Sequence, residues 1–179
     1  GYYTGQHAPG GRNPAAALQA AHHMLLSHGY AAEAIRATAR LTPRIGIALN
    51  LNPVHAATES DRDRQAARRF DGMLNRLILD ALLRGRYPLE VLGLLGRFFP
   101  RVQPGDMAHI AAPLDFLGVN YYTRSVVRHD GKAPFVWAAP VERRPLGGVR
   151  PGGYGPGGAI PDGLDADGCV SVHRPRHTV

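Results

Sequence analysis

The stretch Asp115-Phe116-Leu117-Gly118-Val119-Asn120-Tyr121-Tyr122 decides the fold of this chain. It opens as a short apolar run of bulky residues, which predicts a buried strand over residues 114–120. The run ends in an amide and two phenols, which are hydrogen-bonding groups placed where the strand stops. A parallel α/β barrel presents its site in this way, with an apolar strand below and polar groups at the carboxyl-terminal mouth. The stretch therefore predicts a strand of an α/β fold with Asn120 and Tyr122 at its functional end.

A second short apolar run, residues 45–50, lies upstream and ends at Asn50. Turn residues bound this run, so we predict a second buried strand. Between the two runs lies a helical segment that Ser60 or Asp61 can cap. Its predicted inner face consists of Ala67, Phe70, Leu74, Leu77 and Ala81. Strands joined by a long helical connection are nearly always parallel neighbours in one sheet. We therefore expect Asn50 and Asn120 to lie at the same end of that sheet.

Upstream of both strands the sequence predicts a long amphipathic helix. Asn13-Pro14 supplies an N-cap followed by proline at the first helical position. Apolar residues then recur at three- to four-residue spacing to about Arg40, and Thr42-Pro43 ends the helix. Between the two predicted strands, a shorter apolar helix reaches Phe99 and a loop follows over residues 100–106.

After about Arg143 the composition changes. Glycine pairs alternate with proline and arginine, and few apolar residues are available to cover a core. Segments of this kind are poorly ordered. We therefore divide the chain into residues 1–145 and a Gly/Pro/Arg-rich tail, residues 146–179, which we expect to be disordered or shifted in reading frame.

The chain carries 21 Lys and Arg against 14 Asp and Glu, a net charge of +7. A basic protein that binds nucleic acid is therefore an alternative function. However, every basic residue except Lys132 is an arginine, in a chain rich in alanine, glycine and proline, as a GC-rich genome produces without selection for binding. Acidic residues are also mixed with the basic ones, as from Glu59 to Arg69. We therefore expect no nucleic-acid partner.

Cys169 is the only cysteine, so no disulfide can form within the chain, which fits a reducing compartment. No apolar run approaches the roughly 20 residues that a membrane helix needs, and no signal peptide is visible. We expect a cytoplasmic protein without a membrane partner. Because the chain opens at Gly1 in what reads as the middle of a loop, we also expect a central fragment. The sequence leaves the oligomeric state open.

Five segments resemble, in the same order, motifs of glycoside hydrolase family 1, the β-glucosidase family. They are residues 5–10, similar to the G-x-H-A-P-G loop; residues 20–28, similar to the helix after it; residues 44–50, similar to the fifth strand; residues 75–88, similar to N-x-x-F-x-D-P-x-x-x-G-x-Y-P; and residues 115–122, similar to D-F-x-G-x-N-Y-Y. Ile78 replaces the usual Phe and Ala81 the usual Pro. The resemblance covers about residues 1–145 and implies a partial (β/α)8 barrel, roughly strands five and six with their helices.

The resemblance also implies an activity and a set of site residues. Family members hydrolyse β-glycosidic bonds with retention of configuration and without a cofactor, so the implied substrate is a β-glucoside or oligosaccharide. They use a tyrosine at the position of Tyr122 to hold the catalytic nucleophile, and the asparagine at Asn120 helps to organise the same sugar subsite. Asn50, at the end of the neighbouring predicted strand, lies where it can line the aglycone side. These three are the expected substrate-binding residues.

The residues that would carry the chemistry are missing from the sequence. Retaining glycosidases need two carboxyl groups about 5–5.5 Å apart, one as acid/base and one as nucleophile. The chain contains neither the N-E-P nor the E-N-G segment that carries them in the family. Glu33, Glu59 and Glu90 fall on or beside predicted helices, where we expect solvated surface. We therefore expect no catalytic residue in this chain and an inactive fragment.

Three histidines share the first predicted helix. His22, His23 and His28 lack the i, i+4 spacing of the H-E-x-x-H metal motif, and no acidic residue sits between them. We therefore expect hydrogen bonding within the helix layer and no metal site.

Overall fold

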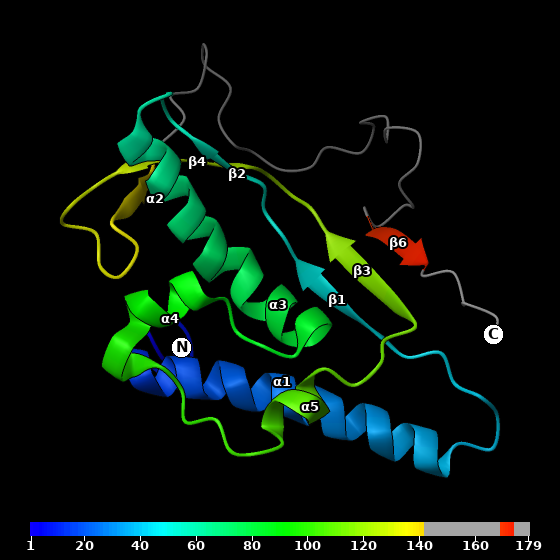
Figure 1. Cartoon of the computed structure of the whole chain (residues 1–179). Helices are drawn as coiled ribbons and strands as arrows, with labels where there is room; N and C mark the ends of the chain where they lie inside the picture. Colours follow the sequence, from blue (N-terminus) through cyan, green and yellow to red (C-terminus); the bar gives the residue numbers. More distant parts are fainter. Residues whose placement is uncertain (142–168, 174–179) are drawn as a thin grey trace.

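The computed structural model describes residues 1–141 and 169–173, which form helices packed beside two small sheets (Figure 1). The helices are α1 (Pro14–Thr38), α2 (Asp61–Asp71), α3 (Leu77–Arg84), α4 (Leu89–Leu95) and α5 (Asp106–Ile110), with a π-helical turn η1 (Gly72–Arg76) and a 3-10 turn η2 (Gly96–Phe98). The strands are β1 (Gly46–Asn50), β2 (Val54–Ala56), β3 (Phe116–Asn120), β4 (Ser125–His129), β5 (Ala138–Pro140) and β6 (Cys169–His173).

The strands β1 and β3 pair in parallel, in a register that runs from Gly46 opposite Phe116 to Asn50 opposite Asn120. This confirms the predicted parallel pairing and the placement of the two asparagines at one end. Beyond these ends the two chain segments stay side by side, because β2 and β4 also pair in parallel. The second sheet has the order β2-β4-β5, with β5 antiparallel to β4.

The other edge of β3 is occupied by β6, which runs antiparallel with Cys169 opposite Asn120. We expected the whole tail, residues 146–179, to be disordered or shifted in reading frame. For the segment 169–173 the expectation of disorder was wrong, because the backbone groups along the edge of β3 offer a template to which five residues without proline can pair. The rest of the predicted tail, residues 142–168 and 174–179, lies outside the described residues.

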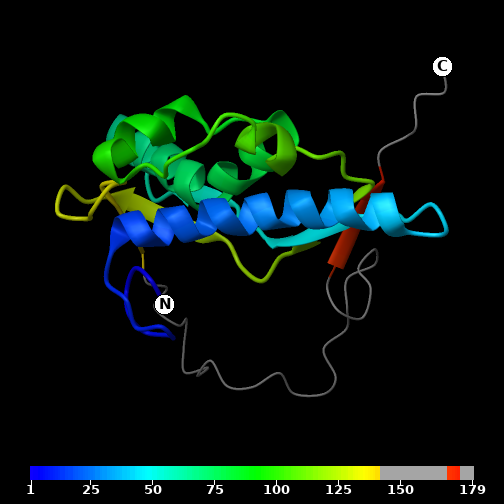
Figure 2. The same cartoon turned by 90° about the horizontal axis from the view of Figure 1, so that it is seen from below.

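The helix α1 begins as predicted. Asn13 Oδ1 accepts a hydrogen bond from Ala16 N at 3.1 Å, and Pro14 is the first helical residue. Leu25 is buried as expected, but Ile35 is 46% exposed. The reason is that the last turns of α1 extend beyond the other helices (Figure 2). Where α1 crosses α5 it carries Gly29, and a methyl group at that position would overlap the carbonyl oxygen of His109.

The π turn η1 changes which side chains of the second helical segment face inward. Leu77 and Ala81 are buried as predicted, whereas Leu74 is 38% exposed and Asn75 only 7%. A π turn inserts one extra residue into a helix and so rotates the residues that follow. Asn75 thereby takes the inward place that the apolar spacing predicted for Leu74.

The main core lies between the helices and one face of the β1–β3 pair. Its buried members are Leu25, Leu77, Ala81, Leu82, Tyr87, Val91, Leu95 and Ile110. Ile47 and Leu49 of β1 pack against this cluster, but none of the five β1 residues is buried. Parallel strands are normally covered on both faces. The described helices therefore cover this sheet on one face only, and Ile45, Ile47, Phe116 and Val119 stay partly exposed.

Candidate functional site

Two amides meet where β1 and β3 end. Asn120 Nδ2 donates a hydrogen bond of 2.9 Å to Asn50 Oδ1, across the last register pair of the two strands. Leu51 N donates to Asn120 O at 3.1 Å, so the ladder continues one step past the strand ends. The carboxyl ends of parallel strands are where α/β folds place ligand-binding groups. We call Asn50, Asn120 and Tyr122 the mouth.

Tyr122, the third predicted site residue, stands apart from this amide pair. It lies two residues beyond β3 and is 69% exposed, and the adjacent Tyr121 is 54% exposed. The Tyr122 hydroxyl makes no hydrogen bond to any residue in the ranges 1–141 and 169–173. Two of the three predicted residues, Asn50 and Asn120, are therefore in contact, whereas the phenol of Tyr122 is exposed beside them.

A buried amide on η1 holds the loop that follows β1. Asn75 Oδ1 accepts from Asn52 N at 3.2 Å, and Asn75 Nδ2 donates to Asn52 O at 2.8 Å and to Asp71 Oδ1 at 2.7 Å. With its amide oriented to satisfy both ends, Asn52 donates in turn to Thr123 O at 3.2 Å. Asn75 therefore fixes the loop after β1, and Asn52 fixes that loop against the one after β3.

Sequence reasoning missed Asn75 as a residue that positions the mouth. The available signal was an amide within a helical segment whose inner positions are otherwise apolar. That signal is weak, because the inward orientation of Asn75 depends on η1, and the apolar spacing does not predict a π turn.

Carboxylates near the strands bind backbone amides. Asp63 Oδ1 accepts from His129 N at 2.7 Å and Asp63 Oδ2 from Thr58 Oγ1 at 2.7 Å, and these bonds, the backbone one first, lower the pKa of Asp63. Asp115 Oδ2 accepts from Ile45 N at 2.8 Å, which is the main reason that the pKa of Asp115 is also lowered. Both groups are structural anions that tie strands to their neighbours. Asp115 also precedes the amino end of β3, opposite to the mouth.

His22 forms a buried hydrogen-bonded network within the helix layer. The side chain is 1% exposed, its Nδ1 lies 2.9 Å from Tyr87 Oη, and its Nε2 lies 3.0 Å from Asp106 Oδ2. The backbone N–H of Gln103 donates to the same carboxylate oxygen at 2.7 Å and, ahead of His22, lowers the pKa of Asp106. Burial raises the pKa of Tyr87 to about 12. This network ties α1 to α5 and to the segment before α4.

The other two histidines of α1 behave differently. His23 Nε2 lies 2.8 Å from Gln19 Nε2, so His22 and His23 both form the hydrogen bonds that we predicted. His28 does not, because its Nε2 is buried without a hydrogen-bond partner among residues 1–141 and 169–173, and burial lowers the pKa of the ring. Within the described ranges, no group of three or more His, Cys, Asp or Glu residues is arranged to hold a metal ion.

One arginine of α2, Arg64, and the arginine of η1, Arg76, are paired with nearby carboxylates. Arg64 lies 2.8 Å from Glu59 and 3.1 Å from Asp61, and Arg76 pairs with Asp80 at 2.9 Å and with Glu90. The positive charge of these two arginines is therefore balanced locally. The three glutamates expected on the surface, Glu33, Glu59 and Glu90, are exposed as predicted.

Comparison with known proteins adds the decisive observation, since the model of glycosyl hydrolase family 1 matches residues 1–139. The chain belongs to this family. It is 40% identical over 126 residues to a β-glucosidase from an Agrobacterium species, and these residues are 70% of this chain and 27% of the relative. It is 38% identical over 133 residues to a bifunctional β-D-glucosidase/β-D-fucosidase from Bifidobacterium breve, covering 73% of this chain and 27% of that one.

Solved structures agree with this family membership. The β-glucosidase from Exiguobacterium antarcticum B7 superposes with a TM-score of 0.75 at 36% identity, over 80% of this chain and 33% of that one. The family 1 β-glucosidase from Thermotoga maritima gives a TM-score of 0.73 at 34% identity, over 80% of this chain and 32% of that one. The chain therefore shares an α/β fold with these enzymes and spans about a quarter to a third of their length.

Among the helices formed by the described residues, none combines the length and the apolar character needed to cross a bilayer.

Proposed function

We propose that this chain supplies part of the sugar-binding edge of a retaining β-glucosidase and does not hydrolyse substrate by itself. The observation that carries the proposal is the 2.9 Å hydrogen bond between the side chains of Asn120 and Asn50 at the carboxyl ends of two parallel strands. In this proposal β1 and β3 are strands five and six of a (β/α)8 barrel, and the substrate is a β-glucoside or an oligosaccharide.

The mouth offers the mixture of hydrogen-bonding groups that a sugar requires. Sugar hydroxyls both donate and accept, and an asparagine side chain offers two donors and an acceptor oxygen. In the amide pair the Asn50 oxygen accepts one bond, and its NH2 group, which donates to no other described residue, is available for a substrate hydroxyl. Tyr122 adds a phenol with an apolar ring and a polar tip, well suited to the edge of a sugar ring.

The same residues position a sugar without breaking its glycosidic bond. Retention requires an acid/base carboxyl and a nucleophile carboxylate on either side of that bond. The sequence has neither N-E-P nor E-N-G, and Asp63 and Asp115 are each bound to backbone amides. In our proposal both catalytic carboxylates come from polypeptide outside this sequence, and the exposed side chain of Tyr122 would hold the nucleophile.

Titration with methyl β-D-glucoside, followed by NMR of the side-chain amides, tests the proposal. We expect the amide signals of Asn50 and Asn120 to move in a saturable way, and the Asn120→Ala variant to lose this response because the amide pair is broken. Gln65→Ala, at an exposed position of α2, is the control and should leave the response unchanged. Signals of Asn50 and Asn120 that stay fixed up to the solubility limit of the sugar would contradict a sugar-binding mouth.

A further inference from the structure

We propose that His55, Arg124 and Arg128 bind the anionic group of a β-glucoside whose aglycone is negatively charged. We call these three residues the basic face. The inference rests on the proposed function, because it names the class of glucoside that the mouth would receive. It adds a preference for negative charge, which sugar binding by the two amides does not require.

The basic face lies on the side of the second sheet that α2 leaves uncovered. The residues of β2 and β4 that pack with Ala66 and Ala67 of α2 are Val54, Ala56 and Val127. Successive side chains of a strand point to opposite faces of the sheet. His55 of β2 and Arg128 of β4 are direct neighbours of those packed residues and therefore point away from α2. Both are exposed, and so is Arg124, which directly precedes β4.

The strand register brings these side chains within reach of one small ligand. His55 pairs with Val126, and Arg128 is the next residue of β4 on the same face as Val126. The spacing between strands and the rise along a strand place such diagonal neighbours about 8 Å apart, which an arginine side chain spans. From Arg124 to Arg128 the basic face extends over about 13 Å of strand.

The side chains of the basic face are not neutralised within the described part of the chain. Among residues 1–141 and 169–173, none of the three forms a side-chain hydrogen bond or an ion pair. The carboxylates near β4 are bound elsewhere, since Asp63 accepts from His129 N at 2.7 Å and Asp130 accepts from Lys132 N at 2.9 Å. Each guanidinium therefore offers its fork of N–H donors, which suits a carboxylate or a phosphate.

The mouth lies on the same side of the chain as the basic face. Ile47 and Leu49 of β1 pack against the helix cluster, so Asn50, the next residue, points away from the helices. The helical run α2–η1–α3 follows both sheets (Figure 1), so the basic face and Asn50 are both turned away from it. Arg124 is also only two residues beyond Tyr122 in the sequence. A glucoside whose sugar is held at the mouth therefore extends its aglycone towards the basic face.

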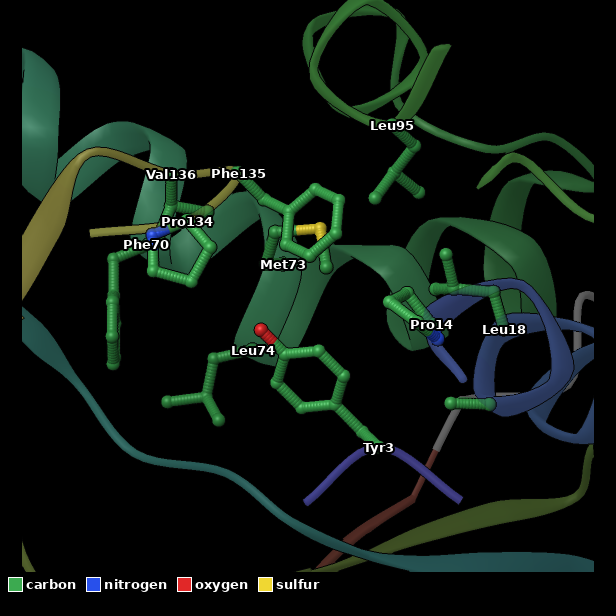
Figure 3. Close-up of a pocket in the computed structure, with 11 residues that line it drawn as sticks. Tyr3, Pro14, Leu18, Phe70, Met73, Leu74, Leu95, Pro134, Phe135 and Val136 are labelled. Atoms are coloured by element: carbon green, nitrogen blue, oxygen red, sulfur yellow. The ribbon is translucent and has the colours of Figure 1, made fainter. Parts of the chain in front are cut away.

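The apolar pocket on the helix side is not suited to the same anionic group. This pocket has a volume of about 340 Å³ and lies between α1, η1 and the loop before β5 (Figure 3). Among the described residues that line it, the Tyr3 hydroxyl is the one polar side-chain group. An anion placed there would lose its hydration without gaining a charged partner.

The small extent of the basic face favours one anionic group over a nucleic acid. Proteins that bind nucleic acids through the backbone neutralise several phosphates, often six to ten. Two arginines and one histidine over about 13 Å of strand match one or two anionic groups. An acidic aglycone needs only one such contact, beside a sugar that the mouth binds.

NMR titration with two ligands that differ by one carboxylate tests the inference. The ligands are 4-carboxyphenyl β-D-glucoside and phenyl β-D-glucoside. At low ionic strength we expect the carboxylated glucoside to bind about five-fold or more tightly than the neutral one, since exposed ion pairs are weak individually and two arginines contribute. The difference should nearly vanish in about 1 M salt, where the Debye length is about 3 Å.

Two variants that remove the same charge separate the basic face from a general effect of net charge. Arg128→Gln should abolish most of the preference for the carboxylated glucoside and leave the affinity for phenyl β-D-glucoside unchanged. Arg62→Gln removes a positive charge from an exposed position of α2 and should leave the preference as it is. Circular dichroism confirms that each variant is folded.

The outcomes distinguish a failure of the basic face from a failure of the mouth. Equal affinity for the two glucosides would overturn the basic face and leave the sugar-binding mouth intact. Binding of the carboxylated glucoside alone, lost in Arg128→Gln, would support the basic face and refute the mouth. The inference is also overturned if neither glucoside binds, if both variants lower the preference equally, or if a single-stranded RNA oligonucleotide binds through Arg128 more tightly than the carboxylated glucoside.

Discussion

The helix layer and the sheet of this chain are packed to very different degrees. Buried side chains of α1, α3, α4 and α5 form one cluster, and His22, bonded to Tyr87 of this cluster, is hydrogen-bonded through both ring nitrogens. The strand β1 has no buried residue, and β3 has only Gly118. The helix layer therefore holds the fold together, whereas the groups proposed to bind sugar lie on the β1–β3 sheet, which is partly exposed.

The largest effect is expected where the helix layer is tied together. His22→Ala removes a buried ring, leaves the Tyr87 hydroxyl without its hydrogen bond to His22 and takes one of two hydrogen bonds from Asp106 Oδ2, which should lower the free energy of unfolding by about 3 kcal/mol. His23→Ala, on the exposed side of the same helix, should change it by less than about 0.5 kcal/mol. Urea denaturation measures both values, and equal values for the two variants would mean that the buried network does not stabilise the helix layer.

Alkaline pH should weaken the same layer. The pKa of Tyr87 is raised from 10.0 to about 12, so the folded state favours the neutral phenol. This contribution is complete below pH 10 and is lost as the pH rises towards 12, by up to about 2–3 kcal/mol. Denaturation at a series of pH values measures the loss. Tyr87→Phe has no titrating group and should remove this part of the pH dependence; an identical alkaline profile would assign it to other residues.

A smaller effect is expected at the support behind the mouth. Asn75→Ala removes the bonds to both backbone groups of Asn52 and should cost about 1–3 kcal/mol, since Asn52 loses its partner in a partly buried loop. Hydrogen exchange should rise most over residues 51–53. Gln65→Ala is the control at an exposed position. Exchange that rises evenly over the whole chain would contradict a local role for Asn75.

The smallest effect is expected at the mouth. Asn50 is exposed, and its side chain accepts one hydrogen bond from Asn120. Asn50→Ala should therefore change the free energy of unfolding by no more than about 0.5 kcal/mol. A loss as large as that of His22→Ala in the same denaturation experiment would show that the mouth is part of the stabilising core.

Elements with a local signal in the sequence were predicted, and elements that depend on distant contacts were not. Asn13 and Ser60 cap α1 and α2 as their residue types favour, and both short apolar runs form strands. The helix α5 was missed, since its five residues lie directly after a predicted loop and its first residue, Asp106, is bonded to His22, 84 residues away. The short strands β2 and β5 depend in the same way on pairing with β4.

The same distinction between local signals and distant contacts applies to the residues of the candidate site. The prediction that Asn50 and Asn120 lie at the same end of the sheet required only that each ends an apolar run and that the two strands are parallel neighbours. Asn75 was missed because its inward place follows from the π turn, which the apolar spacing does not show. Tyr122 was predicted to follow the end of the strand over residues 114–120. The sequence has no E-N-G segment to carry the nucleophile that we propose this tyrosine would hold.

The decisive assay uses the purified chain with nitrophenyl β-glucoside, a mock preparation as the blank and an intact family 1 β-glucosidase as the positive control. Losing either member of the carboxylate pair removes the covalent route, so we predict no turnover above the mock preparation. Turnover that copurifies with the chain would contradict the central claim that this sequence offers sugar-binding groups without the catalytic carboxylates.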